Sequence, residues 1–241
     1  MNERDFLIAC ALEAKGEYET VLKLLQKRPL LNKKNDVSCL TILDEDYPAE
    51  FRLLKYPPFV LFYKGDITLL KANKISIVGS RNPCRYACEA TLRLAGHTNE
   101  VVVSGLAKGI DSLAHQAAKR TIAILGSGID NCYPKTNHDL YRKIADEGLI
   151  LSEYPADVLP LKHHFPWRNR LIAALGSSLY LMEVRPKSGS LSTLNAALEL
   201  NRDIYVLPFS LFEAGGAYNN QLIAEGAQLI CRQQLGLTSD I

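Results

Sequence analysis

The sequence predicts an α/β fold, in which a doubly wound, mostly parallel sheet of the extended Rossmann-like type follows a small N-terminal helical module. Two observations lead to this prediction. From about residue 74, short apolar runs rich in β-branched residues alternate with amphipathic stretches of helical period. Turn residues bound each apolar run, as expected where buried strands are joined by helical crossovers.

The N-terminal part of the chain follows a different pattern. Apolar residues recur at helical spacing over residues 6–12 and 18–26, which assigns residues 1–45 to a small helical module. Residues 46–73 form a connector, because closely spaced prolines favour extended backbone. The apolar end of this connector is expected to pack on the sheet domain, which spans residues 74–235.

The sheet domain is predicted to contain seven strands with helices between them. The strands are expected at 75–78, 101–103, 121–125, 149–151, 178–182, 204–207 and 228–230. The helices are about ten residues long, close to the usual length, and are expected at 86–95, 110–119, 137–147, 169–175, 191–200 and 219–225. In such sheets, ligands bind beyond the carboxyl ends of the strands, where the following loops converge.

Length and composition restrict the class of protein. The 241 residues suffice for one large domain and a small appendage, and 47% hydrophobic with 22% charged residues is ordinary for a soluble globular protein. The net charge of +2 is too small to identify a polyanionic ligand, so local clustering must decide. No apolar run reaches the roughly 18–20 residues that span a bilayer, and residues 1–5 lack the basic region followed by an apolar core that is typical of a signal peptide. A cytoplasmic protein with no membrane partner is therefore expected.

The cysteines give little sign of a metal site. Six are scattered along the chain, and none forms a CxxC pair of the kind that zinc ribbons use. Cys84 and Cys88 stand four apart on a predicted helix but have no visible partner ligands. Free thiols in a reducing compartment, with no bound metal, are therefore expected.

Basic residues gather in the loops that follow three of the predicted strands. Gly79-Ser80-Arg81 follows the first, and Lys187-Ser188-Gly189 follows the fifth. Arg168, Asn169 and Arg170 stand at the predicted opening of the helix at 169–175, where free backbone N–H groups favour an anion. On its own, the arginine pair could equally be a structural ion-pair node.

A glycine-rich loop follows the second strand and opens a helix. Ser104 to Asp111 resembles a phosphate cradle and contains Gly105, Lys108 and Gly109. It matches neither the dinucleotide fingerprint nor the P-loop, so no NAD or ATP cofactor is expected. Asp111 and His115 stand four apart, and a capping and packing role is favoured over a metal or acid/base pair.

Several other residues at strand ends have two possible roles. Tyr133 could stack on a base, although a packed aromatic is the favoured role. Glu153 is more readily explained as an arginine partner than as a catalytic group, because no base or nucleophile is evident beside it. One of the two arginines at 168 and 170 is expected to pair with Glu153 or Glu183, so that the two contribute unequally.

These motifs, in this order, resemble the DprA/Smf family of DNA-processing proteins. The resemblance covers roughly residues 45–232, and the collinear occurrence of several motifs makes it specific. Its segments are Tyr47-Pro48…Pro58 with Leu61 to Gly65, Gly79 to Arg81, Ser104 to Asp111, Leu125 to Asp130 with Tyr133-Pro134, Ser152 to Pro155, Phe165 to Arg170, Lys187 to Ser190, and Asn220…Leu222-Ile223 with Gly226-Ala227.

The resemblance implies a function. Such proteins form homodimers, bind single-stranded DNA in a basic pocket, protect incoming DNA and help to load a RecA-type recombinase during natural transformation; no catalytic activity is implied. Carried onto this chain, the pocket would use Arg81, Arg168, Asn169, Arg170, Lys187, Ser188 and Gly189, with Gly105, Lys108 and Gly109 as further contributors.

The sequence also departs from the family pattern. The N-terminal module is shorter than the family's sterile-alpha-motif-like domain, and no C-terminal winged-helix domain is expected before Ile241. The alternative function is an enzyme or sensor for a nucleotide or nucleotide-sugar, similar to a phosphoribohydrolase. It would need a carboxylate poised over a sugar, for which Asp111, Glu153 and Glu183 are the candidates.

Overall fold

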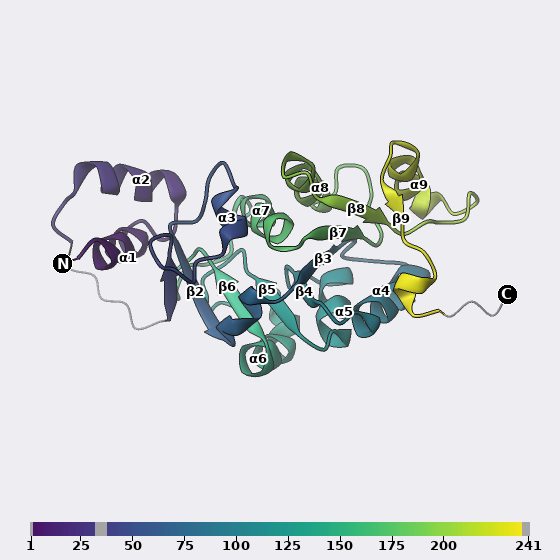
Figure 1. Ribbon diagram of the computed structural model, residues 1–241, viewed down its shortest axis with the longest axis horizontal. Coiled ribbons are helices and arrows are strands. Elements are labelled where there is room, and N and C mark those ends of the chain that lie inside the picture. Colours follow the sequence, from purple (N-terminus) through teal and green to yellow (C-terminus); the bar gives the residue numbers. More distant parts are fainter. Residues whose placement is uncertain (1, 32–37, 238–241) are drawn as a thin grey trace.

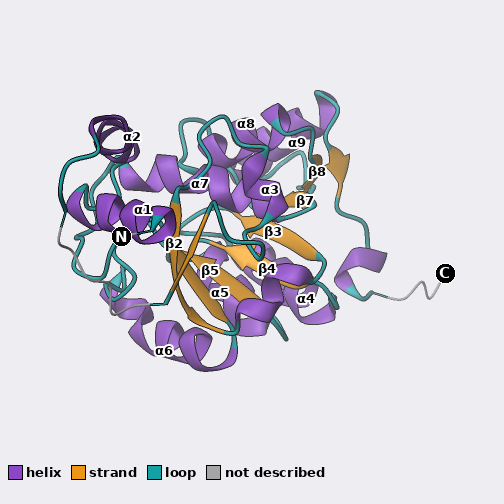
Figure 2. Cartoon of the chain, turned by 60° about the vertical axis from the view of Figure 1, so that its left-hand side comes forward, coloured by secondary structure: helices purple, strands orange, loops and turns teal. Residues whose placement is uncertain are grey.

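The computed structural model describes residues 2–31 and 38–237, and its strands form a single sheet with helices on both faces (Figures 1 and 2). The strand order is β1-β2-β6-β5-β4-β3-β7-β8-β9. The strands are β1 Cys39–Thr41, β2 Val60–Gly65, β3 Lys74–Val78, β4 Val101–Ser104, β5 Thr121–Ile124, β6 Leu149–Ser152, β7 Ser178–Leu181, β8 Asp203–Val206 and β9 Gln228–Leu229.

The seven predicted strands are all present, with ends that differ from the prediction by at most one residue. From β6 through β5, β4, β3, β7 and β8 to β9 the neighbours pair in parallel. All residues of β3 to β7 are buried, because helices cover both faces of this part of the sheet. The predicted doubly wound, mostly parallel fold is therefore confirmed.

Two antiparallel strands at one edge extend this sheet. β2 pairs with β6, so that Phe62 faces Ser152, and β1 pairs in turn with β2. The apolar end of the connector at 46–73 thus enters the sheet as a strand instead of packing on its surface. Val60, Leu61 and Phe62 are all buried, because this edge is covered on both faces.

The helices alternate with the strands along the chain. They are α1 Glu3–Glu13, α2 Tyr18–Lys27, α3 Ala49–Arg52, α4 Arg85–His97, α5 Ile110–Ala117, α6 His138–Glu147, α7 His164–Leu175, α8 Ser190–Glu199 and α9 Ala217–Ala224. In Figure 1, α4, α5 and α6 lie on one face of the sheet and α3, α7 and α8 on the other. Residues 32–37 of the predicted N-terminal module lie outside the described residues.

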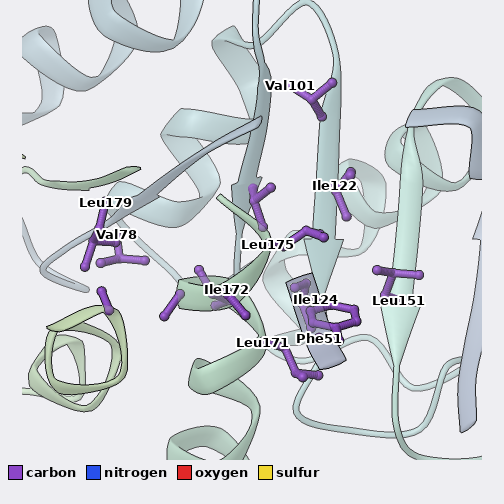
Figure 3. Close-up of a cluster of buried hydrophobic side chains, with 14 of the residues drawn as sticks. Phe51, Val78, Val101, Ile122, Ile124, Leu151, Leu171, Ile172, Leu175 and Leu179 are labelled. Carbon is purple, nitrogen blue, oxygen red and sulfur yellow. The ribbon is translucent and has the colours of Figure 1, made fainter. Parts of the chain in front are cut away.

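Alternate residues of the central strands enter different cores. Val101 and Val103 pack in the cluster that contains the buried residues of α7, whereas Val102 packs with α4 and α5 on the other face. Leu171, Ile172 and Leu175 of α7 lie against strand side chains in the first cluster (Figure 3). No helix within the described ranges is both long and apolar enough to cross a bilayer.

Helix α7 begins earlier than predicted. Its first residue is His164, five residues before the predicted start at Asn169, and Pro166 occupies its first turn, where a missing N–H costs nothing. Arg168, Asn169 and Arg170 therefore lie past the opening of the helix. The expectation that free N–H groups at the helix start would surround these three residues was wrong.

Candidate functional site

The direction of winding reverses between two neighbouring strands of the sheet. After β3 the chain adds β4, β5 and β6 on one side, and then β7, β8 and β9 on the other. Loops that leave β3 and β7 diverge at their carboxyl ends, which opens a crevice at this switch point. This topology places a candidate site beside the Gly79–Arg81 and Lys187–Gly189 loops.

A cavity of about 640 Å³ occupies this crevice, and we call it the switch-point cavity. Its lining includes Gly79, Ser80, Arg81, Ala107, Asp111, Tyr133, Lys162, Phe165, Pro166, Arg168, Asn169, Arg185, Ser188, Gly189 and Ser190. A smaller hollow of about 200 Å³, the side lobe, shares five of the lining residues. It adds Gly105, Lys108 and Pro134. Loops after β3, β4, β5 and β7 thus meet α7 around one concave surface.

Arg81 projects from the loop after β3 and lines both hollows. Its side chain is exposed, and its guanidinium carbon lies 5.9 Å from the centre of the Phe165 ring. Only glycine fits at position 109, where the backbone passes close to this loop. A Cβ on Gly109 would lie 2.4 Å from the Ser80 carbonyl oxygen, and Gly109 has φ +77°. Gly109 therefore positions Arg81 through the backbone.

Arg168 also lines both hollows, but its guanidinium is already engaged. Nη1 donates to the carbonyl oxygens of Gly105 (2.8 Å) and Ile124, and the side chain is almost fully buried. Burial lowers the pKa of Arg168 to about 10, and the nearby Asp111 opposes this effect. Arg168 thus ties the end of β5 to the loop after β4, and it shapes the cavity wall.

Arg170 is not among the residues that line either hollow. Its Nη1 and Nη2 atoms both donate to the Glu153 carboxylate at 2.6 Å, and its guanidinium lies 4.2 Å from the Trp167 ring centre. Both partners are largely buried. The predicted pairing of one arginine with Glu153 is confirmed, and Arg170 is committed to it instead of facing a ligand.

Asn169 joins α7 to the loop after β7. Its Nδ2 donates to the Gly189 carbonyl oxygen at 3.1 Å and to Ser192 Oγ at 2.7 Å, while Oδ1 accepts from Arg168 Nε at 3.1 Å. The side chain is buried. Asn169 therefore fixes the Gly189 backbone at the cavity edge.

The loop after β7 presents a positively charged rim at the start of α8. Lys187 is exposed, with φ +65°, and stands just before the cavity-lining Ser188. The Ser188 hydroxyl is buried and has no hydrogen-bond partner within the described chain. A Cβ on Gly189 would meet nothing within 4 Å, so the space above this residue is open. Unused donors at a helix N-terminus favour an anion.

Four cations around the two hollows form no ion pair with any described residue. Arg81 and Lys162 line the cavity, Lys108 lines the side lobe and Lys187 stands at the rim. Arg185 also lines the cavity, but its Nη2 pairs with Glu183 at 3.1 Å. Lys162 and Arg185 were absent from the predicted site; both are basic residues beside motifs that were identified, which is the only sequence signal for them.

An aromatic wall completes the cavity. The ring centres of Tyr133 and Phe165 lie 5.4 Å apart, and both residues line the two hollows. Tyr133 is 45% exposed, so the packed role favoured from the sequence does not describe it. An exposed Tyr133 ring and a half-buried Phe165 ring beside unpaired cations suit stacking of bases next to their phosphates.

The carboxylates that an enzyme would need are all engaged. Asp111 accepts from the backbone N–H groups of Gly105 and Ala107, Glu153 holds Arg170, and Glu183 accepts from the Cys84 N–H at 2.7 Å. Burial raises the pKa of Asp111. His115 contacts Thr121 Oγ1 through Nδ1 (2.6 Å) and not Asp111, and burial lowers its pKa to about 3. The predicted packing role agrees with these contacts, but Asp111 does not cap α5: Gly109 is the N-cap residue, and Asp111 instead holds the loop that precedes the helix.

Known proteins are similar to this chain over most of its length. The DNA recombination-mediator protein A family matches residues 38–238. DNA processing protein DprA of Streptococcus pneumoniae is 42% identical over 200 residues, which cover 80% of this chain and 71% of that protein. The Bacillus subtilis DprA is 38% identical over 237 residues, with 94% and 78% covered.

Two solved structures are also similar. The X-ray structure of Streptococcus pneumoniae DprA aligns with a TM-score of 0.81 at 32% identity, covering 99% of this chain and 98% of that one. A Helicobacter pylori DprA structure, described for its single-stranded DNA binding mode, aligns with a TM-score of 0.76 at 36% identity, covering 85% and 96%. The chain belongs to the DNA recombination-mediator protein A family, also known as DprA/Smf.

Proposed function

We propose that this chain binds single-stranded DNA in the switch-point cavity without reading its sequence. One observation carries the proposal: unpaired cations, the exposed Tyr133 ring and the half-buried Phe165 ring line one cavity, and the lining carboxylate Asp111 is already engaged. A concave surface of this kind attracts phosphates and offers rings on which any base can stack. The relative from Helicobacter pylori, whose structure is described for its single-stranded DNA binding mode, supports the same ligand.

The proposed contacts divide into two groups. Arg81, Lys108, Lys162 and Lys187 neutralise phosphates, and the Ser188 hydroxyl with the Gly189 backbone adds donors at the start of α8. Gly105, Gly109, Arg168 and Asn169 hold the loops in place and so determine the shape of the cavity. Arg170 is left out of the contact set, because Glu153 occupies its guanidinium.

We further propose a cytoplasmic homodimer that protects incoming single strands and passes them to a RecA-type recombinase. One cavity grips only a few nucleotides, and two cavities on one strand multiply affinity through effective concentration. Family membership supports the mediator role. The proposed dimer face lies within residues 195–230, where Leu198, Leu211, Phe212 and Leu229 are exposed.

Comparing the affinities of the protein for single-stranded and double-stranded DNA tests the proposed ligand. Fluorescent oligo-dT and a duplex of equal length are titrated with the protein at low and at high salt, and anisotropy gives both affinities. We expect tight binding of the single strand, weaker binding of the duplex, and no hydrolysis of mononucleotides. A duplex bound as tightly as the single strand, or turnover lost in Glu183→Gln, would reject the proposal in favour of the enzyme.

A further inference from the structure

A cluster of two histidines and one carboxylate stands outside the proposed DNA site. Glu17 lies between α1 and α2, His163 directly precedes α7, and His164 is the first residue of that helix. Glu17 Oε1 lies 3.2 Å from His163 Nε2 and 2.9 Å from His164 Nε2. The three candidate ligand atoms all lie within 4.8 Å of one another. This group joins the N-terminal module to the helix that lines the cavity.

These separations fit a small transition-metal ion. Zinc binds imidazole nitrogen and carboxylate oxygen at roughly 2.0–2.2 Å in tetrahedral geometry, so neighbouring ligand atoms stand about 3.3 Å apart. The two O–N separations of 2.9 and 3.2 Å are close to that edge length. Two imidazoles and one carboxylate form the protein ligand set of open zinc sites, in which solvent takes the fourth position.

The three side chains differ in exposure in a way that suits such a site. The His164 side chain is fully buried, and its ring stacks on Tyr154 with centres 3.9 Å apart, which holds the imidazole in place. The side chains of Glu17 and His163 are 43% and 64% exposed, so an ion and a water molecule can reach them. We propose that Glu17, His163 and His164 bind a divalent metal ion of the zinc class.

A metal-free arrangement is the alternative. The Leu161 N–H points at His164 Nδ1 across 3.4 Å, which favours a proton on Nε2 and a hydrogen bond from it to Glu17. Metal at Nε2 leaves the imidazole proton on Nδ1, where it faces the Leu161 N–H, so the Leu161 backbone must shift when the ion binds; the contact to be broken is at the long end of hydrogen bonding, and Leu161 is 47% exposed. Bound metal would then fasten the module to α7, whose Phe165, Arg168 and Asn169 line the cavity.

Metal titration of the full chain tests this site. Tag-free protein, stripped with EDTA, is titrated with ZnCl₂ by calorimetry and with CoCl₂ by absorption, beside Glu17→Gln and His163→Gln. We expect one equivalent bound to the wild type. Each variant should bind more weakly by more than the roughly 10- to 100-fold that loss of an outer hydrogen-bonding partner costs. Cobalt should show tetrahedral d–d bands without thiolate charge transfer.

Two matched controls separate this site from other ligands. His138→Gln removes an exposed histidine on α6, and the Cys84→Ser/Cys231→Ser double variant removes the two exposed thiols. Both should bind metal as the wild type does, and zinc should raise the melting temperature of the wild type but not of Glu17→Gln. Circular dichroism in EDTA checks that each variant is folded. Binding that survives in Glu17→Gln and His163→Gln, fails in the thiol variant, or is absent from the wild type would overturn the proposal.

Discussion

The basic residues of this chain divide into those that face the cavity and those that build it. Arg81 and Lys108 pair with no described carboxylate, whereas Arg170 is held by Glu153 and Arg168 by two carbonyl oxygens. Sequence motifs place all four at strand ends but cannot show which carry a free charge. The partners come from other loops, and only the folded structure shows that Arg170 points away from the crevice.

Replacing Arg170 separates a structural role from a ligand contact. Arg170→Ala leaves the Glu153 carboxylate buried without its partner, which costs about 3–5 kcal/mol of unfolding free energy. The Arg170→Met/Glu153→Leu double variant should recover much of that loss, since removing both charges costs less than removing one. Urea unfolding measures stability, and anisotropy measures DNA affinity of the folded protein. A variant with normal stability but weakened DNA binding would show that Arg170 contacts the strand.

Adding a side chain should destabilise the fold at one glycine of the site and leave it stable at another. A Cβ on Gly105 would lie 2.6–2.7 Å from the Arg168 guanidinium, which is buried and cannot move away. Gly105→Ala should therefore destabilise the fold by about 1–3 kcal/mol, as overpacking does. Gly189 has helical φ −61° and ψ −23° with open space at its Cβ, so Gly189→Leu should fold normally.

The effect of Gly189→Leu on binding completes this comparison. The added side chain would project over the open edge of the cavity that Gly189 lines, and it should weaken oligo-dT binding at unchanged melting temperature. Thermal unfolding and anisotropy are measured on both variants. Full oligo-dT affinity in Gly189→Leu would place the strand elsewhere on the protein.

At the scale of elements, the hydrophobic pattern predicted the strands whose positions are determined by the local sequence. All seven parallel strands were located because each is a short apolar run between turn residues. β2 was missed because Val60 to Phe62 follow two prolines, and its partner β6 lies nearly ninety residues further along the chain. The start of α7 was misplaced because no capping residue marks it: His163 is the N-cap residue and makes no side-chain capping bond.

Helix α5 should make the protein sensitive to acid. His115 is buried in α5, and burial lowers its pKa from 6.5 to about 3, so the folded protein keeps it neutral. Between these values the unfolded chain takes up a proton that the folded chain does not, so stability falls as pH falls. From pH 7 to pH 5 this should cost about 2 kcal/mol.

Urea unfolding at both pH values, with His115→Gln beside the wild type, isolates the histidine. The variant should lose less stability than the wild type between pH 7 and pH 5, because glutamine does not titrate. Equal losses in the two proteins would show that His115 can accept a proton in the folded state.

At the scale of the molecule, the doubly wound topology explains why the site lies where it does. Winding reverses between β3 and β7, so the loops that carry Arg81 and Lys187 meet at one rim although about a hundred residues separate them. The N-terminal module sits at the opposite end of the sheet from α9 (Figure 1). Assembly through the α9 end would leave both the cavity and the module accessible.

Light scattering tests the proposed dimer. The wild type should be dimeric at micromolar concentration, and the Leu211→Ser/Phe212→Ser variant should shift toward monomer, because these side chains are 89% and 99% exposed. Leu53→Ser, at an exposed leucine after α3, is the matched control and should stay dimeric. A monomeric wild type, or a dimer unaffected by the double substitution, would contradict a dimer face that includes Leu211 and Phe212.

The salt dependence of oligo-dT binding tests the central claim most directly. Affinity is measured over a salt series for the wild type, for Arg81→Ala, and for Arg142→Ala, a control at an exposed arginine on α6. If Arg81 neutralises a phosphate, its removal should weaken binding and lower the log–log salt slope by about 0.7. The control should match the wild type. An Arg81→Ala variant with the wild-type slope and affinity would contradict binding of single-stranded DNA in the switch-point cavity.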